Sequence, residues 1–185
     1  MMTIQDLLDL SKTIAAPLFA GKTYPWEALA DIGDFILQLG PTLPADEYEQ
    51  RGEHLRLERD PNIPASAYLA SPCIIDHGAE LRPSAFIRGN AIVGKNAVVG
   101  NSCELKNVVL FDNVQTPHFN YVGDSILGYK AHMGAGSITS NVKSDKTLVV
   151  IKNGAERIET GRKKVGAILG DYVEVGCNSV LNPGT

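Results

Sequence analysis

The stretch that decides the fold is residues 63–111, which read IPASAYLASPCIIDHGAELRPSAFIRGNAIVGKNAVVGNSCELKNVVLF. Bulky apolar residues recur there at every sixth position: Ile63, Leu69, Ile75, Leu81, Ile87, Val93, Val99, Leu105 and Phe111. A smaller residue follows four positions after each of the first eight: Ala67, Cys73, Ala79, Ala85, Ala91, Ala97, Cys103 and Val109. Neither an α-helix nor an ordinary strand has a period of six, whereas a chain that turns a corner every six residues does. We therefore expect three flat faces per coil, with successive coils stacked as parallel strands about 4.8 Å apart.

The six-residue frame breaks twice further along the chain. At the first break, over Pro117–Asn120, the register moves by four residues, to Tyr121, Leu127, Met133 and Thr139. The second break spans 140–164, where 148–158 reads as a hairpin with a tight turn at Asn153-Gly154. Hexads resume at Leu169, Val175 and Leu181. Because irregular segments of a regular solenoid are where function overrides local rules, both breaks are candidate sites.

Residues 1–62 have a different pattern, which predicts an N-terminal helical arm followed by a linker. Apolar residues at helical spacing indicate helices over 3–19 and 25–39, and Gly40-Pro41 ends the second one. Residues 41–62 are polar and contain prolines, with one short strand expected at 54–57. We interpret the arm as an oligomerisation element or the remnant of a larger domain, and 63–185 as the β-helix with its insertion at 140–164.

Composition narrows the classes of function. The 185 residues carry a net charge of −4, which argues against a general nucleic-acid binder, and their apolar runs are too short to span a membrane. Three cysteines, with no signal peptide, favour a cytoplasmic protein. Residues 141–164 nevertheless carry seven basic and three acidic side chains. This local excess of positive charge indicates either an anionic small ligand or a solvated loop.

Three side chains stand out as candidates for chemistry. Arg88 and Lys106 lie 18 residues apart, so they stack on one face of adjacent coils, and a phosphate between them would relieve their repulsion. The alternative is that both extend into water. His118 lies at the first break, and an imidazole is the side chain that most often accepts a proton in catalysis, although a surface histidine at a turn is the simpler interpretation. The sequence does not indicate a zinc site with three histidine ligands. His77 and His132 do not lie at the distances from His118 along the chain that such a site requires.

Several irregular strings carry a resemblance to a known family. They are Glu104-Leu105-Lys106, Pro117-His118-Phe119-Asn120-Tyr121-Val122-Gly123-Asp124, Gly134-Ala135-Gly136-Ser137-Ile138-Thr139-Ser140-Asn141 and Gly161-Arg162-Lys163-Lys164-Val165-Gly166-Ala167. With them, residues 63–185 resemble the hexapeptide-repeat acyltransferases. They are most similar to the C-terminal acetyltransferase domain of the bifunctional N-acetylglucosamine-1-phosphate uridylyltransferase/glucosamine-1-phosphate acetyltransferase and to its archaeal sugar-1-phosphate relatives. The resemblance implies an all-β fold, a single-stranded left-handed parallel β-helix with a short N-terminal helical segment.

The resemblance also implies an activity and roles for individual residues. The activity is transfer of an acetyl group from acetyl-CoA, the co-substrate, to an amino-sugar phosphate such as glucosamine-1-phosphate, in the synthesis of UDP-N-acetylglucosamine-type nucleotide sugars. His118 matches the general base, Asn141 and the backbone N–H of Ala135 match groups that stabilise the oxyanion, and Arg88 and Lys106 match the sugar-phosphate clamp. Tyr121 also matches a substrate-binding residue, and Lys146 lies one residue from the position of a family lysine. No metal is expected.

The family further implies a homotrimer whose sites lie between subunits. Two features depart from its pattern: the final coils that help to bind acetyl-CoA are short, and His132 stands where the bacterial enzymes have asparagine. The first 62 residues are too few for a nucleotidyltransferase domain, so we expect no such activity from this chain alone. A second hypothesis is a non-catalytic β-helix subunit, related to sugar nucleotidyltransferases, that oligomerises or senses a sugar phosphate or nucleotide.

Overall fold

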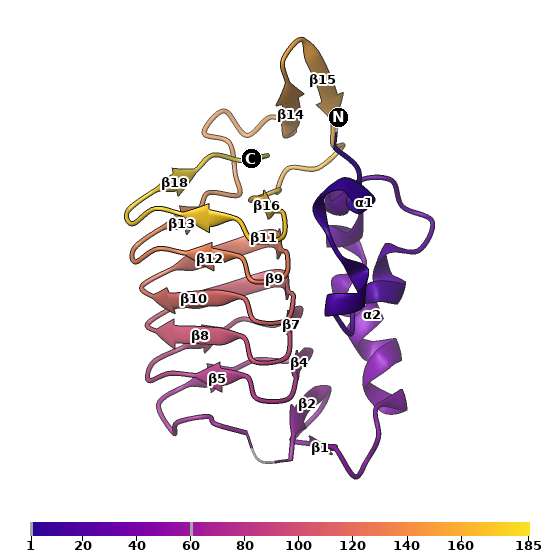
Figure 1. Ribbon diagram of the computed structural model, residues 1–185, viewed down its shortest axis with the longest axis vertical. Coiled ribbons are helices and arrows are strands. Elements are labelled where there is room, and N and C mark those ends of the chain that lie inside the picture. The colour runs from indigo at the N-terminus through magenta and orange to yellow at the C-terminus, as the bar shows by residue number, and fades with distance from the viewer. Residues whose placement is uncertain (1, 60) are drawn as a thin grey trace.

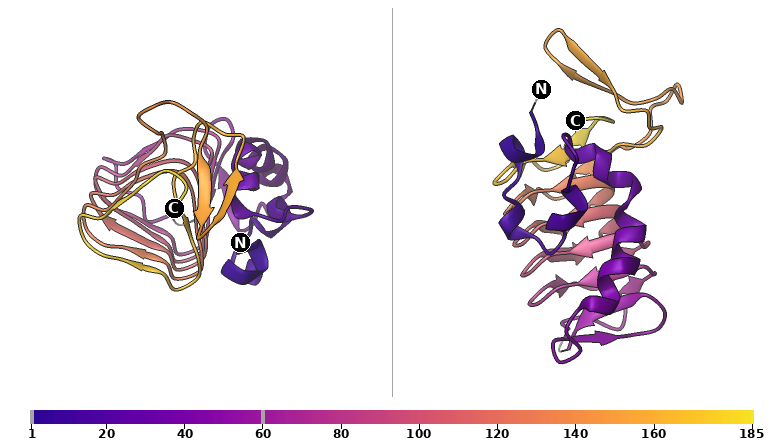
Figure 2. Two further views of the ribbon diagram at one scale, coloured as in Figure 1. Left: turned by 90° about the horizontal axis from the view of Figure 1, so that it is seen from above. Right: turned by 90° about the vertical axis from the view of Figure 1, so that its right-hand side faces the viewer.

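The chain forms a left-handed parallel β-helix with a helical segment along one side (Figure 1). The computed structural model describes residues 2–59 and 61–185; residues 1 and 60, which fall within the predicted arm and linker, lie outside the described residues. Viewed along its axis, the β-helix has a triangular outline with the helical segment against one edge (Figure 2). Across the described residues, no helix is long and apolar enough to cross a membrane. The predicted fold class is confirmed.

The N-terminal segment consists of short helices rather than two long ones. Its elements are α1 (Ile4–Leu7), η1 (Leu10–Lys12), η2 (Ala16–Phe19), η3 (Pro25–Ala30), α2 (Ile32–Leu39) and η4 (Gly40–Thr42), the η elements being 3₁₀-helices. The helix predicted over 3–19 is therefore wrong, and it is divided into α1, η1 and η2. Leu8 and Thr13 have extended backbones, and Pro17 has no N–H with which to continue an α-helix. The second predicted helix is present as η3 and α2.

The strands form the three faces of the β-helix. In chain order they are β1 (Tyr48–Gln50), β2 (Leu55–Glu58), β3 (Tyr68–Leu69), β4 (Cys73–Ile75), β5 (Glu80–Leu81), β6 (Phe86–Ile87), β7 (Ala91–Val93), β8 (Val98–Asn101), β9 (Glu104–Leu110), β10 (Gln115–His118), β11 (Tyr121–Leu127), β12 (His132–Met133), β13 (Ile138–Thr139), β14 (Val150–Asn153), β15 (Glu156–Glu159), β16 (Ile168–Leu169), β17 (Glu174–Val175) and β18 (Val180–Leu181).

We call the three faces of the β-helix the covered face, the second face and the third face. The covered face, beneath the N-terminal segment, contains β2, β4, β7, the second halves of β9 and β11, and β16. The second face contains β5, β8, β10, β12 and β17. The third face contains β3, β6, the first halves of β9 and β11, β13 and β18. Strand β2 already pairs in parallel with β4, so stacking begins within the segment predicted as a linker.

The strand register corrects the predicted position of the first frame break. Along the third face, Tyr68 pairs with Phe86 and Phe86 with Glu104, each 18 residues on, but Glu104 pairs with Tyr121, only 17 residues on. Leu110, not Phe111, pairs with Val93. The frame therefore shortens by one residue at Asn107 and again at Asp124, instead of moving forward by four residues over Pro117–Asn120. The large inward position at the start of β11 is Val122 rather than Tyr121.

These two shortened corners have a simple conformational basis. In the lower coil, the corner between the third and covered faces uses two residues with positive φ, Gly89 and Asn90. In the next two coils a single residue with positive φ, Asn107 (56°) and then Asp124 (48°), makes the same turn. Asparagine and aspartate are the non-glycine residues that tolerate this region best. Strands β9 and β11 consequently run around the corner without interruption.

The N-terminal segment packs on the covered face and buries its outward side chains. Ile74, Ile92, Val109 and Ile126 pair in register on this face, and each is 0% exposed. Backbone hydrogen bonds hold the first part of the segment at two points, where Asp112 N–H donates to Lys12 O (3.0 Å) and Asp171 N–H donates to Leu7 O (2.9 Å). The predicted hairpin is confirmed: β14 and β15 pair antiparallel, with Ile151 opposite Ile158.

Candidate active site

Arg88 and Lys106 stack in adjacent coils at the edge of the third face, as the repeat predicts. The backbone N–H of Arg88 donates to Leu105 O (2.8 Å), and Lys106 pairs in turn with Gly123 of β11. Both cations, however, already have carboxylate partners. Arg88 Nη1 lies 2.7 Å from Glu104 Oε1, and this hydrogen bond raises the pKa of Arg88. Two carboxylates, Glu104 and Asp124, therefore already offset the two positive charges, so Arg88 and Lys106 repel each other less than the repeat alone predicts.

Asp124 joins the candidate residues into one cluster. It lies at the second shortened corner and is 3% exposed. Lys106 Nζ donates to its two carboxylate oxygens at 3.0 and 3.1 Å, and Asn141 Nδ2 donates to Oδ2 at 2.5 Å. Asn107 Nδ2 donates to Oδ1 at 3.0 Å. A buried carboxylate with donors on both oxygens has little freedom to rotate, so it fixes the side chains that point at it.

Tyr121 completes this cluster through its hydroxyl group. Asn141 Nδ2 donates to Tyr121 Oη at 3.2 Å. A Cβ atom on Gly123 would lie 2.4 Å from that oxygen and 2.9 Å from Asn141 Nδ2, so only glycine leaves room for the phenol. Burial raises the pKa of Tyr121, partly opposed by the Asn141 hydrogen bond, and the charges of Asp124 and Glu104 raise it further. At neutral pH the phenol is therefore protonated and able to donate a hydrogen bond.

His118 lies away from this cluster, at the corner between the second and third faces. Its backbone N–H donates to Asn120 Oδ1 (3.1 Å), whereas its exposed ring has no partner within the part of the chain that the structure describes. Ala135 occupies the same corner one coil higher, where the N–H of neighbouring Gly136 donates to His118 O (3.0 Å). A single chain thus brings His118 together with Ala135, and Arg88 and Lys106 together with Tyr121 and Asn141, but it shows no contact between the two groups.

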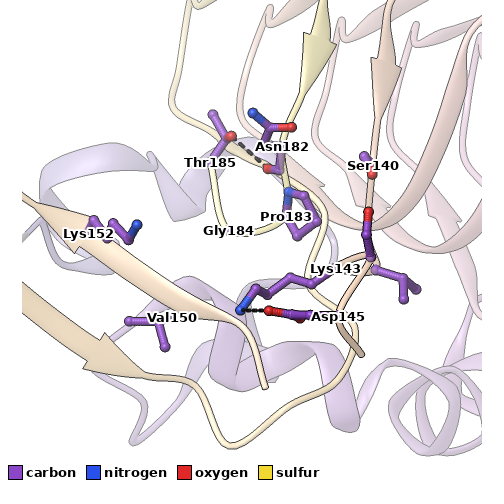
Figure 3. Close-up of a pocket in the computed structure, with 11 residues that line it drawn as sticks. Ser140, Lys143, Asp145, Val150, Lys152, Asn182, Pro183, Gly184 and Thr185 are labelled. Atoms are coloured by element: carbon purple, nitrogen blue, oxygen red, sulfur yellow. Dashed lines mark hydrogen bonds and ion pairs between the residues drawn. The ribbon is translucent and has the colours of Figure 1, made fainter. Parts of the chain in front are cut away.

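Lys146 belongs to neither group. It is exposed in the loop before the hairpin, with positive φ, and its backbone N–H donates to Lys143 O (3.0 Å). Beside this loop lies a cavity of about 670 Å³, between the hairpin and the last coil (Figure 3). Its lining includes Lys143, paired with Asp145 at 3.3 Å, and Lys152 of β14. The cationic segment predicted from the sequence therefore borders a polar cavity near the top of the β-helix.

Among residues 2–59 and 61–185, no three or more His, Cys, Asp or Glu side chains are grouped to hold a metal ion. His132 is outward on the second face, where its Nδ1 lies 2.7 Å from Glu174 Oε2. His77 lies far from it, beside buried Asp76, with Nδ1 2.8 Å from Asp76 Oδ1.

Sequence reasoning missed Glu104 and Asp124 as members of the site. The signal that could have found Asp124 is its distance along the chain, because it follows Lys106 by 18 residues, one regular coil. Glu104 precedes Lys106 by two residues and so lies on the same outward side of β9. Stacking brings it beside the guanidinium of Arg88, its neighbour from the coil below.

Comparison with protein families identifies this region of the chain. The family model described as the GMPPB C-terminal domain matches residues 69–185. The chain belongs to this family. The matched region runs from β3 to the last coil and includes both groups of candidate residues, from Arg88 to Lys146. Every site residue discussed above therefore lies within the GMPPB C-terminal domain itself, and the N-terminal segment lies outside the match.

Curated relatives agree with the resemblance seen in the motifs. The bifunctional sugar-1-phosphate nucleotidylyltransferase/acetyltransferase of Sulfurisphaera tokodaii is 33% identical over 128 residues, 69% of this chain and 32% of that protein. The bifunctional protein GlmU of Methanocaldococcus jannaschii is 36% identical over 102 residues, 55% of this chain and 25% of that protein. GlmU of Trichormus variabilis is 35% identical over 126 residues, 65% of this chain and 27% of that protein. The chain thus spans about a quarter to a third of these relatives.

Proposed function

We propose that this GMPPB C-terminal domain protein is an N-acetyltransferase that transfers an acetyl group from acetyl-CoA to an amino-sugar phosphate of the glucosamine-1-phosphate type. The observation that carries the proposal is the clustering of Arg88, Lys106, Tyr121 and Asn141 at one edge of the third face. The relatives support it, because their names include a sugar-1-phosphate and an acetyltransferase. The product would serve the synthesis of nucleotide sugars of the UDP-N-acetylglucosamine type.

Each group has a defined part in the proposed reaction. Arg88 and Lys106 hold the phosphate, and the phenol of Tyr121 donates to the sugar phosphate. The amine nitrogen attacks the thioester carbonyl carbon, a C–N bond forms, and the amine proton passes to His118. The N–H of Ala135 and the amide of Asn141 stabilise the oxyanion. The oxyanion then re-forms the carbonyl group, the C–S bond breaks, and protonated His118 returns its proton to the sulfur so that CoA leaves as the thiol. The cavity beside Lys143 and Lys152 supports binding of the phosphates of acetyl-CoA.

The proposed site lies between two copies of the chain in a homotrimer. His118 and the phosphate clamp are at opposite edges of the third face, and a row of exposed apolar side chains lies on that face between the two edges. Tyr68, Phe86, Ile138 and Val180 are between 37% and 63% exposed and belong to one register, in which Glu104 and Tyr121 lie between Phe86 and Ile138. Apolar side chains aligned in this way favour burial against a second copy. That copy would bring its own His118 to the clamp.

A thiol-release assay tests the proposed activity. The protein is incubated with acetyl-CoA and either glucosamine-1-phosphate, galactosamine-1-phosphate or glucose-1-phosphate, and free CoA is measured with a thiol reagent. We expect release with an amino-sugar phosphate and none with glucose-1-phosphate, which lacks the amine. Absence of release with every amine, together with measurable binding of the sugar phosphates, would replace this proposal with the non-catalytic alternative, a subunit that binds or senses the ligand.

A further inference from the structure

The N-terminal segment is linked to the buried carboxylate of Asp124, the partner of Lys106, through one buried side chain, that of Asn107. Asn107 makes the first shortened corner, is 8% exposed and lies beneath η3. Its Nδ2 donates to Leu29 O of η3 at 3.0 Å and to Asp124 Oδ1 at 3.0 Å. These two hydrogen bonds use both protons of the amide. The orientation of the Asn107 side chain is therefore set jointly by the backbone of the N-terminal segment and by the carboxylate at the centre of the cluster.

The carboxylate passes that constraint to the ligand-binding side chains. Lys106 Nζ lies 3.0 and 3.1 Å from the oxygens of Asp124, and Asn141 Nδ2 lies 2.5 Å from Oδ2. Asn141 then donates to Tyr121 Oη. Asp124 itself is too deeply buried to meet a bound sugar phosphate, so its effect on the ligand is exerted through Lys106 and Asn141. A continuous series of hydrogen bonds thus joins Leu29 to the clamp.

We propose that Asn107 and Asp124 are positioning residues, through which the N-terminal segment holds Lys106 and Asn141 in the geometry that binds the phosphorylated sugar. This inference rests on the proposed function for the identity of the ligand. The N-terminal segment lies outside the matched family region. By this inference it does more than cover apolar side chains, because it also helps to orient the side chains that bind the ligand.

The coil below offers a matched control at the same corner. Asn90 also has positive φ (49°), and its side chain lies against Gly33 of α2. Unlike Asn107, the Asn90 side chain makes no hydrogen bond to any residue that the structure describes, and Arg88 beside it is held by Glu104 instead. Because both asparagines have left-handed backbones, glycine removes either side chain without adding backbone strain. Asn107→Gly therefore removes the hydrogen bonds to Leu29 and Asp124, whereas Asn90→Gly removes a side chain from the equivalent corner without removing a side-chain hydrogen bond.

The test measures binding without catalysis. Isothermal titration calorimetry with glucose-1-phosphate, which carries the phosphate but no amine to acetylate, gives the Kd of the full chain and its variants. We expect Asn107→Gly to weaken binding about fivefold or more, the lower end of ordinary coupling between sites, and Asn90→Gly to leave it within twofold. Asp124→Asn weakens binding as well, because its amide group offers a donor where Lys106 and Asn141 require an acceptor.

A double-mutant cycle separates positioning from a general loss of structure. In the Asp124→Asn background we expect Asn107→Gly to have no further effect on the Kd. Asn107→Ser, which keeps a hydroxyl donor but cannot reach both acceptors, is the second variant if the glycine variant does not fold, as judged by circular dichroism. Equal effects of Asn107→Gly and Asn90→Gly, or additive effects in the cycle, would overturn this inference while leaving the proposed function intact. Absence of binding by the unaltered protein would overturn both.

Discussion

Lys106 Nζ lies 3.0 Å from Asp124 Oδ1, and the Asp124 side chain is only 5% exposed while that of Lys106 is 27% exposed. This makes Lys106 both a structural cation and the proposed ligand for phosphate. Arg88 has the same position one coil below, yet its partner Glu104 is accessible to water, at 32% exposed. The two cations of the clamp therefore differ in how strongly the fold depends on them, although the hexad pattern makes them equivalent.

Removing Lys106 should destabilise the fold more than removing Arg88. Lys106→Met leaves the Asp124 carboxylate buried without its cation, and we expect a loss of roughly 3 kcal/mol in the free energy of unfolding. Arg88→Met breaks a solvent-screened pair and should leave that free energy almost unchanged. Urea unfolding followed by circular dichroism measures both. Equal losses in the two variants would contradict the assignment of Lys106 as the structural member of the pair.

His118 should matter for the rate and not for the fold. Because its ring is exposed and unpartnered within the described chain, His118→Ala should keep the unaltered thermal midpoint, while kcat for acetyl transfer falls about a hundredfold or more. The matched control is Asn101→Ala, since Asn101 pairs with His118 in the coil below on the same face. We expect that variant to retain full kcat. A normal rate in His118→Ala would remove the histidine from the mechanism.

Stability should fall at alkaline pH because of Tyr48 on β1. Its hydroxyl donates to the buried carboxylate of Asp76, and burial together with that carboxylate raises the pKa of Tyr48. A tyrosine with a raised pKa in the folded state stabilises the protein fully below the unfolded pKa of about 10, and this stabilisation is lost as the pH rises further. Denaturant unfolding between pH 8 and pH 11 should show a steeper decline for the unaltered protein than for Tyr48→Phe. Parallel curves would show that Tyr48 does not titrate differently on folding.

The exposed apolar row on the third face should control assembly. Tyr68 and Phe86 contact each other edge to face, with ring centroids 5.6 Å apart, and both remain accessible in a single chain. A glutamate at position 86 would bury a charge if a second copy covers this face, so Phe86→Glu should shift sedimentation from trimer to monomer. Leu37→Glu, an exposed position on α2, is the control. A monomer for both the unaltered protein and the variant would contradict the proposed trimer.

The sequence predicted the solenoid well because its signal is repeated in every coil. Large inward residues such as Val93 and Leu105 and small corner residues such as Ala91 each specify the same local geometry, so the fold class and the stacking of Arg88 on Lys106 followed directly. The hairpin followed from its turn signal at Asn153-Gly154.

The frame break was misplaced for a physical reason. Phe111 is fully buried, as an inward residue would be, but it is buried against Phe19 of η2, with centroids 5.9 Å apart, and not inside the coil. Hydrophobicity alone cannot distinguish these two kinds of burial. The sequence pattern also could not place the N-terminal segment or Asp124. Their positions depend on contacts between parts of the chain that are far apart in sequence, such as the hydrogen bond from Asn107 to Leu29.

The most direct test of the central claim, one acetyltransferase site shared by two copies, is complementation between two inactive variants. His118→Ala lacks the proton acceptor, and Arg88→Glu repels the phosphate; each should be inactive alone at low substrate concentration. When the two are co-expressed in equal amounts and assemble at random, about a quarter of the sites receive an intact His118 from one copy and an intact clamp from its neighbour. We predict that the mixed protein recovers about a quarter of the unaltered thiol-release rate. A mixture as inactive as its parents would contradict a site between subunits.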